Sequence, residues 1–442
     1  DICCYGRASL LTKNNVTAFA CNKFNQCYTA IKAGDLIISE QPFAFVLSSK
    51  ENGIRCDNCL KRCKVLKCSG CQFVHYCGRV CQRDAWDDHK WECANLKRVS
   101  PKIIPDAARM LARIINRIKR SDGTTYKAFY SATSFRMWKD LMSHYTDLKA
   151  DKKRMDHFTT LCVVLFEFLK DISLPNTVDL MGIYGRMVIN SFTILDMDMN
   201  SIGTGIYLAS SIIDHSCNPN AVATFDGKTL NIRAIKDMPC LDWKQIRISY
   251  IDLMKTPYER QMELLENYYF LCECDRCMDE NQIKYVHAAK CPNTDCDNPV
   301  NITWKENCIL VKKSELTDVD ICKYCLEKQE GVLHPLNVMY SQTLDNAFDA
   351  LIQVQLWEQA CVYAEKLIPF SFFRFYYGQY HPLLGLLHMK YGKILLYKMN
   401  NQGAFNQFKL AEKIIKIAYG ERHPLYKEHL LPYIDQAMIE SP

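Results

Sequence analysis

The alternation of apolar and polar positions predicts two β-rich stretches that lie far apart in the chain. The first, Thr29 to Leu47, reads as a strand, a Gly34-Asp35 turn and further strands at Leu36–Ser39 and Phe43–Leu47. The second predicts short strands at Ile206–Leu208, Ala221–Phe225, Thr229–Ile235 and Ile246–Tyr250. Because the first stretch amounts to half of a small β domain, we expect both to form one β fold that the residues between them interrupt.

Between these stretches, residues 103–195 carry apolar positions at helical spacing. Two sets follow one helix face each: Ala107, Met110, Leu111 and Ile114, and then Leu161, Val164, Leu165 and Phe168. Each set predicts an amphipathic helix whose apolar face needs a partner surface. We therefore expect a largely helical insert within the β fold.

The last third of the chain contains an internal repeat. The pattern G-x-x-H-P-L occurs at Gly331–Leu336, Gly378–Leu383 and Gly420–Leu425 and recurs about every 45 residues. Paired helical patterns lie between the copies, which is typical of stacked helical hairpins of the tetratricopeptide type. We expect the His-Pro pairs to be structural, with Pro stiffening the entry to the next helix, rather than to bind a ligand.

The composition is that of a globular protein. The chain has 442 residues, 48% of them hydrophobic, which is enough for several domains with sizeable cores. No stretch reaches the roughly 18 apolar residues of a membrane span, and Asp1 to Leu11 lacks a signal pattern. We expect a soluble protein without membrane contact, although Asp at position 1 leaves open that residues precede it. A net charge of +6 is too mild to indicate nucleic-acid binding by itself.

The 24 cysteines change this picture, because many stand at metal-ligand spacings. Eight ligands follow the spacings C-x2-C, C-x2-C, C-x3-C and H-x3-C: Cys56, Cys59, Cys68, Cys71, Cys77, Cys81, His89 and Cys93. They predict a structural module with two zinc ions, since so short a segment has too little apolar surface to fold alone. Core or disulfide-bonded cysteines are the alternative, but the clustering favours zinc and a reduced, intracellular setting. Cys63 is surplus.

Another metal site is predicted near the middle of the chain. The triplet Cys272, Cys274 and Cys277 supplies three ligands and lacks a fourth, for which Cys217 is the natural candidate. A zinc ion there would fasten the segment of His215 to the aromatic segment just before the triplet. Aromatic side chains held rigidly beside a polar turn suit a narrow pocket for a cationic group.

A last set of cysteines predicts a fourth zinc site, of the zinc-ribbon type. Its two pairs, Cys291 with Cys296 and Cys322 with Cys325, stand about 25 residues apart, so that each pair would occupy one knuckle. An exposed irregular linker is the alternative.

The order of these pieces resembles the SET-and-MYND (SMYD) family of protein-lysine methyltransferases. The resemblance rests on the eight metal ligands from Cys56 to Cys93 (the cysteine ladder), the motif D-H-S-C-N-P-N-A at Asp214–Ala221 and the C-x-C-x2-C triplet. It covers nearly the whole chain. It implies an α+β fold: a small-stranded β SET fold split by a MYND zinc finger and a helical insert, with an all-α tetratricopeptide-like C-terminal domain. The implied segments are 1–50 (N-terminal part of SET), 51–97 (MYND finger), 98–195 (helical insert), 196–255 (SET core), 256–330 (post-SET zinc segment and extra zinc ribbon) and 331–442 (helical domain).

The resemblance also implies an activity and the residues that carry it. The reaction would transfer a methyl group from S-adenosylmethionine to a neutral lysine amine of a protein, without a catalytic metal, and three or four zinc ions would be structural. Asn190-Ser191-Phe192 is similar to the family's N-S-F motif, and Leu141–His144 is similar to L-x-S-H. The implied cofactor-binding residues are Lys23, His144, Asn190, Asp214, His215, Tyr268 and Phe270, and the implied residues of the lysine channel are Phe192, Tyr250 and Tyr268.

The chain departs from the family pattern in three places. The family's G-x-G cofactor loop is replaced by Asn22-Lys23-Phe24, where side chains would crowd a cofactor. The family's N-H-S-C becomes Asp214–Cys217, in which Asp lacks the amide donor of Asn, and its G-E-E-L turn becomes Leu241–Gln245. These departures leave a second function open: a catalytically weak or inactive scaffold that binds partner proteins in transcriptional regulation.

A third function, nucleic-acid binding, rests on basic residues around the finger: Lys61, Arg62, Lys64, Lys67, Arg79, Arg83, Lys90, Lys97 and Arg98. Such a run is usually a solvated face, and no base-reading helix is evident. The partners we expect are histone or other protein substrates with a target lysine, and proline-rich or other peptides that bind the finger and the helical domain. We expect a monomer located in the cytoplasm and nucleus.

Overall fold

The computed structural model describes residues 10–13, 16–19, 30–120, 123–170, 172–293, 296, 298–300, 317–368 and 372–439. The chain forms two compact units, one of Asp1–Asp214 with Ala223–Ile246 and the other of His215–Val222 with Arg247–Pro442. This division is coarser than the six segments expected from the sequence, whose boundaries stay predictions. Among the described residues, no helix is both long and apolar enough to cross a membrane.

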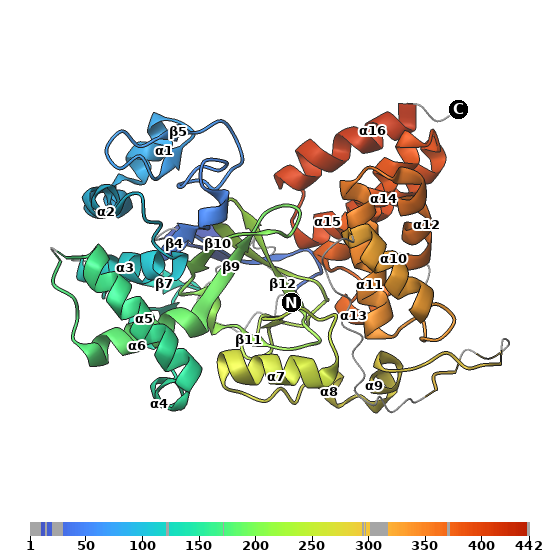
Figure 1. The fold of residues 1–442 in the computed structure, drawn as a ribbon, viewed down its shortest axis with the longest axis horizontal. Coiled ribbons are helices and arrows are strands. Elements are labelled where there is room, and N and C mark those ends of the chain that lie inside the picture. Colours follow the sequence, from blue (N-terminus) through green and yellow to red (C-terminus); the bar gives the residue numbers. More distant parts are fainter. Residues whose placement is uncertain are drawn as a thin grey trace, which may run out of the picture. The chain divides into compact units, whose positions relative to one another are not determined.

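The first unit contains the β fold. Its strands are β1 (Leu10–Lys13), β2 (Val16–Phe19), β3 (Leu36–Glu40), β4 (Ala44–Leu47), β5 (Leu66–Lys67), β6 (His75–Tyr76), β7 (Ala128–Phe129), β8 (Phe135–Arg136), β9 (Ser191–Leu195), β10 (Ser201–Ile206), β12 (Ala221–Asp226, whose first two residues belong to the second unit) and β13 (Thr229–Ala234). One sheet has the order β1-β2-β3-β13-β12. Another has the order β4-β10-β9 (Figure 1). Glu40 of β3 lies opposite Leu230 of β13, and Leu47 of β4 lies opposite Gly203 of β10. Strands from both sides of the interruption therefore pair, which confirms one split β fold.

The residues that interrupt the β fold are mostly helical. The helices of the first unit are η1 (Ser49–Glu51), α1 (Arg79–Asp84), α2 (Trp86–Val99), α3 (Asp106–Lys119), η2 (Trp138–Asp140), α4 (Tyr145–Ala150), α5 (Lys152–Phe168), α6 (Thr177–Asn190) and η3 (Ser210–Ile212). The predicted apolar face of α3 is buried at Met110, Leu111 and Ile114. This helix packs against α5 and α6 and lies along β4 (Figure 1). The insert thus finds its partner surface on the β fold, although strands β7, β8 and β9 within it were not predicted.

Two predicted strands are shorter in the structure than the sequence indicated. The strand expected at Ile206–Leu208 is the end of β10, which stops at Ile206. The strand expected at Ile246–Tyr250 is only β14, Arg247–Ile248. Just after β14, the Ser249 hydroxyl donates to the carbonyl of Ile251 at 2.7 Å. A side chain that bonds to nearby backbone in this way competes with the strand ladder and ends it.

The second unit is mostly helical. Its elements are β11 (Asp214–His215, whose first residue belongs to the first unit), β14, α7 (Pro257–Tyr268), α8 (Asp275–Met278), α9 (Glu280–Val286), α10 (Asp318–Gln329), α11 (Val338–Gln353), α12 (Trp357–Leu367), α13 (Phe372–Tyr377), α14 (Pro382–Tyr397), α15 (Asn401–Ala418), η4 (Leu425–Leu430) and α16 (Leu431–Ile439). Helix α11 packs against α12, and α14 packs against α15 (Figure 1). These are the paired helices that the repeat predicted.

The three G-x-x-H-P-L copies share one local structure. Gly331, Gly378 and Gly420 follow helix ends and have positive φ angles of 78°, 84° and 89°, a conformation that favours glycine. The following histidines, His334, His381 and His423, each accept at Nδ1 the backbone N–H two residues further on, at 3.1, 3.3 and 3.1 Å. The histidines therefore stabilise the entry to the next segment, and the structural role predicted for them is confirmed.

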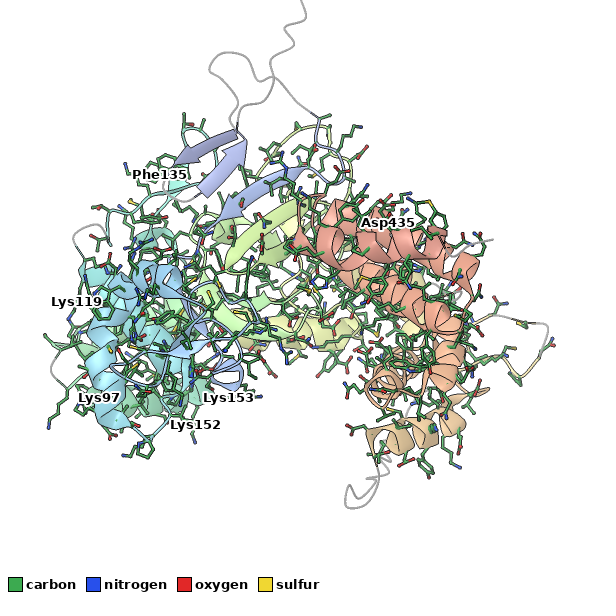
Figure 2. The ribbon with its side chains drawn as sticks, turned by 90° about the horizontal axis from the view of Figure 1, so that it is seen from above. Lys97, Lys119, Phe135, Lys152, Lys153 and Asp435 are labelled. Atoms are coloured by element: carbon green, nitrogen blue, oxygen red, sulfur yellow. The ribbon has the colours of Figure 1, made fainter. Side chains whose placement is uncertain are left out.

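Exposed lysines stand at helix ends in the first unit. Lys97 lies in the last turn of α2, Lys119 ends α3, and Lys152 and Lys153 begin α5 (Figure 2). In α2 and α3 these positions place a cation at the negative end of the helix dipole. These four lysines are therefore typical of a helical surface that faces solvent.

Candidate active site and zinc centres

Two groups of metal ligands lie in the cysteine ladder. Their members are Cys56, Cys59, Cys77 and Cys81 in one group and Cys68, Cys71, His89 and Cys93 in the other, with the ligand atoms of each group within 4.8 Å of one another. The first and third pairs of the ladder therefore share one site, and the second and fourth pairs share the other. The Sγ–Sγ distances of 3.9 Å for Cys59–Cys77 and Cys68–Cys93 are close to the roughly 3.8 Å that a tetrahedron with Zn–S bonds near 2.3 Å gives. Both donor sets fit zinc, and the exposed Cys63 belongs to neither.

A buried charge network joins the zinc finger to α3. The fully buried Glu92 carboxylate accepts from His89 Nδ1 at 3.2 Å and from the guanidinium groups of Arg109 and Arg113 at 2.9 and 2.7 Å. Arg109 also pairs with Asp57 of the finger at 3.2 Å. Burial by itself raises the pKa of Glu92, but the two guanidinium groups outweigh it and hold that pKa well below its usual value. The network orients a zinc ligand and attaches the finger to the helical insert.

Replacing Glu92 by Ala is expected to lower the free energy of unfolding by about 3–5 kcal/mol, because two buried guanidinium groups lose the carboxylate they share. Urea denaturation followed by circular dichroism measures this loss. The control on the same helix is Asp87→Ala, which removes only an exposed ion pair with Lys90 and should cost little. Equal losses in the two variants would contradict this role of Glu92.

A third group of metal ligands lies in the second unit. Cys217 meets Cys272, Cys274 and Cys277, again with all four sulfur atoms within 4.8 Å of one another. The Cys217 Sγ atom lies 3.5 Å from that of Cys277 and 4.0 Å from that of Cys272. The buried Arg260 donates to Cys277 Sγ at 3.6 Å, which offsets the negative charge of a thiolate. Four thiolates at these distances fit a structural zinc ion, so the described residues form three zinc sites.

His215 links this zinc site to Tyr250. The backbone N–H of Tyr250 donates to His215 Nδ1 at 3.0 Å, so Nδ1 carries no proton. The proton must then be on Nε2, which donates to Cys217 Sγ at 3.3 Å. Burial lowers the pKa of His215 to about 4 and keeps the ring neutral. Since both nitrogens are used inside the protein, the adenine contact expected for His215 would involve its ring face or its backbone, and it stays a prediction.

Four aromatic rings form a cluster beside the third zinc site. The ring centroids of Tyr250 and Tyr268 are 5.0 Å apart, those of His215 and Tyr250 5.4 Å, those of His215 and Phe270 6.0 Å and those of Tyr268 and Phe270 6.5 Å. The four side chains thus come from three segments that are distant in sequence. The ligand group of Cys217 with Cys272, Cys274 and Cys277 joins two of them, and the bond from Tyr250 to His215 attaches the third. Rings arranged in this way provide the electron-rich surfaces that bind cationic groups.

Helix α7 places Tyr268 in this cluster. The helix begins with a capping box of Thr256 and Glu259 around Pro257, which is a strong start signal. It ends at Tyr268, because Tyr269 adopts a left-handed conformation with φ of 61°. The chain then turns, and Phe270 and the zinc ligands follow.

In the first unit, the structure brings the Asn190 and His144 segments together. The Asn190 side-chain amide donates to the carbonyls of Met142 and Arg186 at 2.8 and 2.9 Å. Gly185 lies against the same loop, since a Cβ atom there would be only 2.3 Å from the carbonyl oxygen of Ser143. His144 itself has a left-handed backbone with φ of 47° and contacts Asp147 through Nδ1 at 2.9 Å. The two motifs expected to contact the cofactor are therefore packed against each other.

The remaining candidate residues are distributed as follows. Phe192 lies on β9 opposite Gly205, and its ring meets that of Tyr207 edge-on with centroids 5.6 Å apart. Asp214 is exposed on β11. Lys23 lies outside the described residues. The roles of all three stay predictions.

Glu40 is a buried carboxylate that the sequence analysis missed. It accepts hydrogen bonds from the backbone N–H groups of Ala209 and Ser210 at 2.9 and 2.8 Å and from the Ser210 hydroxyl at 2.7 Å. These bonds form the turn that ends β10 ahead of the motif at Asp214. Burial raises the pKa of Glu40 to about 7, although the hydrogen bonds oppose this shift. A glutamate at the end of the mostly apolar Leu36–Glu40 strand was the available signal.

The raised pKa predicts that Glu40 makes folding less favourable as the pH rises. The folded state retains a proton between the unfolded pKa of 4.5 and the folded pKa of about 7, so the unfolded state binds fewer protons in that window. Relative to the Glu40→Gln variant, which does not titrate, the wild type should lose roughly 2 kcal/mol of unfolding free energy between about pH 5.5 and 8. Parallel profiles of unfolding free energy against pH for the two proteins would contradict this.

The fourth zinc site is not formed by the described residues. Cys291, Cys296, Cys322 and Cys325 are all described, yet they make no group of close ligand atoms. Cys322 and Cys325 lie on helix α10, where a knuckle was predicted. The zinc ribbon stays a prediction.

The fold and the site define a zinc-binding SET-type protein with a MYND finger, and comparison with known proteins agrees. The MYND finger family model matches residues 56–93. The chain is 29% identical over 418 residues to histone-lysine N-methyltransferase SMYD3 of Mus musculus, and the alignment covers 91% of this chain and 92% of that protein. It is 27% identical over 412 residues to N-lysine methyltransferase SMYD2-A of Danio rerio (90% and 92%) and 25% identical over 454 residues to histone-lysine N-methyltransferase ASHR1 of Arabidopsis thaliana (93% and 92%). The MYND match and these relatives, which match about nine-tenths of the chain, support a protein of the SET-and-MYND family.

Proposed function

We propose that this protein is an S-adenosylmethionine-dependent protein-lysine N-methyltransferase that acts on histone or non-histone proteins. The observation that carries this proposal is the aromatic cluster of Tyr250, Tyr268, Phe270 and His215 held by the third zinc site. Relatives that match the chain over nine-tenths of its length are named as histone-lysine and N-lysine methyltransferases, which supports the same reaction.

The residues of the cluster suit the two positive groups that such a reaction brings together. S-adenosylmethionine, when bound, supplies the methyl group on a sulfonium centre. The rings of Tyr250 and Tyr268 favour a positive charge in front of them, and their hydroxyls can orient the lone pair of a neutral lysine amine. Phe270 offers a ring face for stacking. In the first unit, Asn190 uses its amide hydrogens inside the protein, so its Oδ1 atom is the acceptor left for an ammonium group.

A scaffold that binds partner proteins is the second candidate. It is favoured by the sequence Asn22-Lys23-Phe24, which stands where the family has the glycines of its cofactor loop. The MYND finger is a protein-interaction module, and we propose that its partners here are proline-rich or other peptides.

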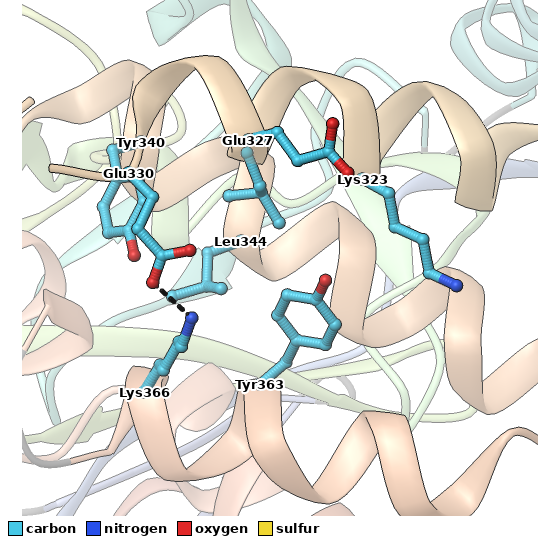
Figure 3. A pocket seen from close by; sticks show the side chains of 8 residues that line it. Lys323, Glu327, Glu330, Tyr340, Leu344, Tyr363 and Lys366 are labelled. Atoms are coloured by element: carbon cyan, nitrogen blue, oxygen red, sulfur yellow. Dashed lines mark hydrogen bonds and ion pairs between the residues drawn. The ribbon is translucent and has the colours of Figure 1, made fainter. Parts of the chain in front are cut away.

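Helices α10, α11 and α12 also border a cavity of about 170 Å³. It is lined by Lys323, Leu326, Glu327, Glu330, Tyr340, Leu344, Tyr363 and Lys366, with Lys366 paired to Glu330 (Figure 3). A cavity of this size can accommodate a side chain of a bound peptide.

The remaining proposals concern the cellular compartment, the oligomeric state and the partners of the protein. None of the cysteines that the structure describes is disulfide-bonded, and many of them stand in metal-ligand groups, which supports a reducing compartment, the cytoplasm and nucleus. We propose a monomer whose substrates are proteins with a target lysine. The basic residues around the finger support nucleic-acid binding less well, because no base-reading element accompanies them.

Calorimetric titration of the zinc-loaded chain with S-adenosylmethionine separates the two candidates. An enzyme should bind with a dissociation constant of about 1 mM or tighter, because substrates of enzymes are bound in roughly the 1 μM to 1 mM range. A fully zinc-loaded chain that gives no heat of binding would contradict the methyltransferase and favour the scaffold.

A further inference from the structure

The turn that follows Tyr250 is held by the C-terminal helices. The Tyr377 hydroxyl of α13 donates to Asp252 Oδ1 at 2.5 Å, and the backbone N–H of Met254 donates to the same oxygen at 2.9 Å. Gln342 of α11 donates from Nε2 to the carbonyl of Met254 at 2.7 Å. Two side chains from the helical repeats therefore bind both ends of the Asp252–Met254 turn, which begins two residues after Tyr250.

The neighbouring residue on α13 contacts the third zinc site instead. The carbonyl of Tyr376 accepts from the Arg276 guanidinium, which also donates to the carbonyl of Cys217 at 3.0 Å. The hydroxyl of Tyr376 donates to the carbonyl of Leu336 at 2.6 Å, so the ring is fixed at both ends. One short helix thus bonds through Tyr376 to Arg276, which in turn bonds to Cys217, and through Tyr377 to the turn after Tyr250.

The Tyr377 hydroxyl has no easy alternative partner. Tyr377 is only 6% exposed, and its ring stacks on that of the half-buried His381 with centroids 4.6 Å apart. Burial and the adjacent Asp252 carboxylate raise the pKa of Tyr377, so the hydroxyl keeps its proton and remains a donor. Asp252 is exposed, so water can solvate its carboxylate, but the buried Tyr377 hydroxyl would be left unsatisfied if the turn moved away.

We propose that Tyr377, supported by Gln342, is a positioning residue for methyl transfer. The hydroxyl of Tyr250 must meet the reacting amine to within a fraction of an ångström, and misplacement of a catalytic group by about 1 Å can cost about 100-fold in rate. The backbone of Tyr250 is fixed on one side by its hydrogen bond to His215 and on the other by the turn that Tyr377 holds. This inference rests on the proposed methyltransferase function.

The test compares Tyr377→Phe with the wild type. Removal of one hydroxyl should lower kcat by about tenfold or more and change KM by less than about twofold, since that hydroxyl bonds to Asp252 within the protein. Hydrogen exchange should rise in the backbone of residues 250–256, while the protein keeps its three zinc ions. Gln342→Met, which removes the second bond, should act in the same direction. The matched control is Tyr397→Phe, an exposed tyrosine of the same helical domain.

The outcomes separate the two proposals. A Tyr377→Phe variant with unchanged kcat and unchanged exchange at residues 250–256, or one no different from Tyr397→Phe, would overturn the positioning role. A wild-type chain that transfers no methyl group would overturn the proposed function, and hydrogen exchange alone would then decide whether Tyr377 holds the turn.

Discussion

Replacing Tyr250 by Phe is expected to lower kcat for methyl transfer by about 100-fold or more, with almost no change in folding. The substitution keeps the ring, and therefore the packing against Tyr268 and His215, and removes only the hydroxyl. A group that orients the amine in the transition state contributes to kcat rather than to uniform binding. Initial rates with a methyl-labelled cofactor and a lysine-containing protein substrate give kcat and KM for both proteins.

Tyr258→Phe is the control for that experiment. Tyr258 stands on α7, the helix that carries Tyr268, but it is 69% exposed. This variant should retain the wild-type rate. Full activity of Tyr250→Phe would remove Tyr250 from the mechanism, and equal loss in both variants would show that the loss is not specific to the Tyr250 hydroxyl.

Replacement of Cys272 by Ser should remove one of the three zinc ions and abolish cofactor binding. Serine is a poor zinc ligand, and a four-cysteine site that loses one thiolate loses most of its affinity. The segment from Tyr268 to Cys277 would then detach from that of His215, and the aromatic cluster would disperse. The ligands of the MYND finger belong to separate groups, so its two zinc ions should remain.

Native mass spectrometry counts the zinc ions in this variant, and calorimetry measures its binding of S-adenosylmethionine. Cys63→Ser is the matched control, because Cys63 is exposed and belongs to no ligand group. It should keep three zinc ions and wild-type binding. A Cys272→Ser protein with three zinc ions, or one that binds the cofactor as well as the wild type, would contradict the zinc-held site.

Cysteine spacing is sufficient to predict the zinc sites, because thiolates two to four residues apart can already meet at one metal. Spacing does not say which pairs share a zinc ion, since that depends on how the chain returns on itself. The alternation of pairs in the finger therefore required the structure. Cys217 could be proposed only because the triplet at Cys272 lacked a ligand, although the two residues lie 55 positions apart.

Long-range hydrogen bonds explain where the sequence analysis failed. The apolar run at Ile206–Leu208 looks like a strand, but Glu40, 169 residues before Ala209, binds the backbone there and turns the chain. The same holds for Tyr377, whose partner Asp252 is 125 residues away. By contrast, the histidine bonds of the G-x-x-H-P-L copies span two residues and could be predicted from the local pattern.

The most direct test of the account is methyl transfer by the wild-type chain itself. The zinc-loaded protein is incubated with methyl-labelled S-adenosylmethionine and core histones or a mixture of other proteins, and mass spectrometry locates the label. The account predicts label on lysine side chains, in amounts that increase with time and enzyme and that fall by about 100-fold with Tyr250→Phe. A wild-type protein with three zinc ions that binds the cofactor but labels no lysine in any of these substrates would contradict it.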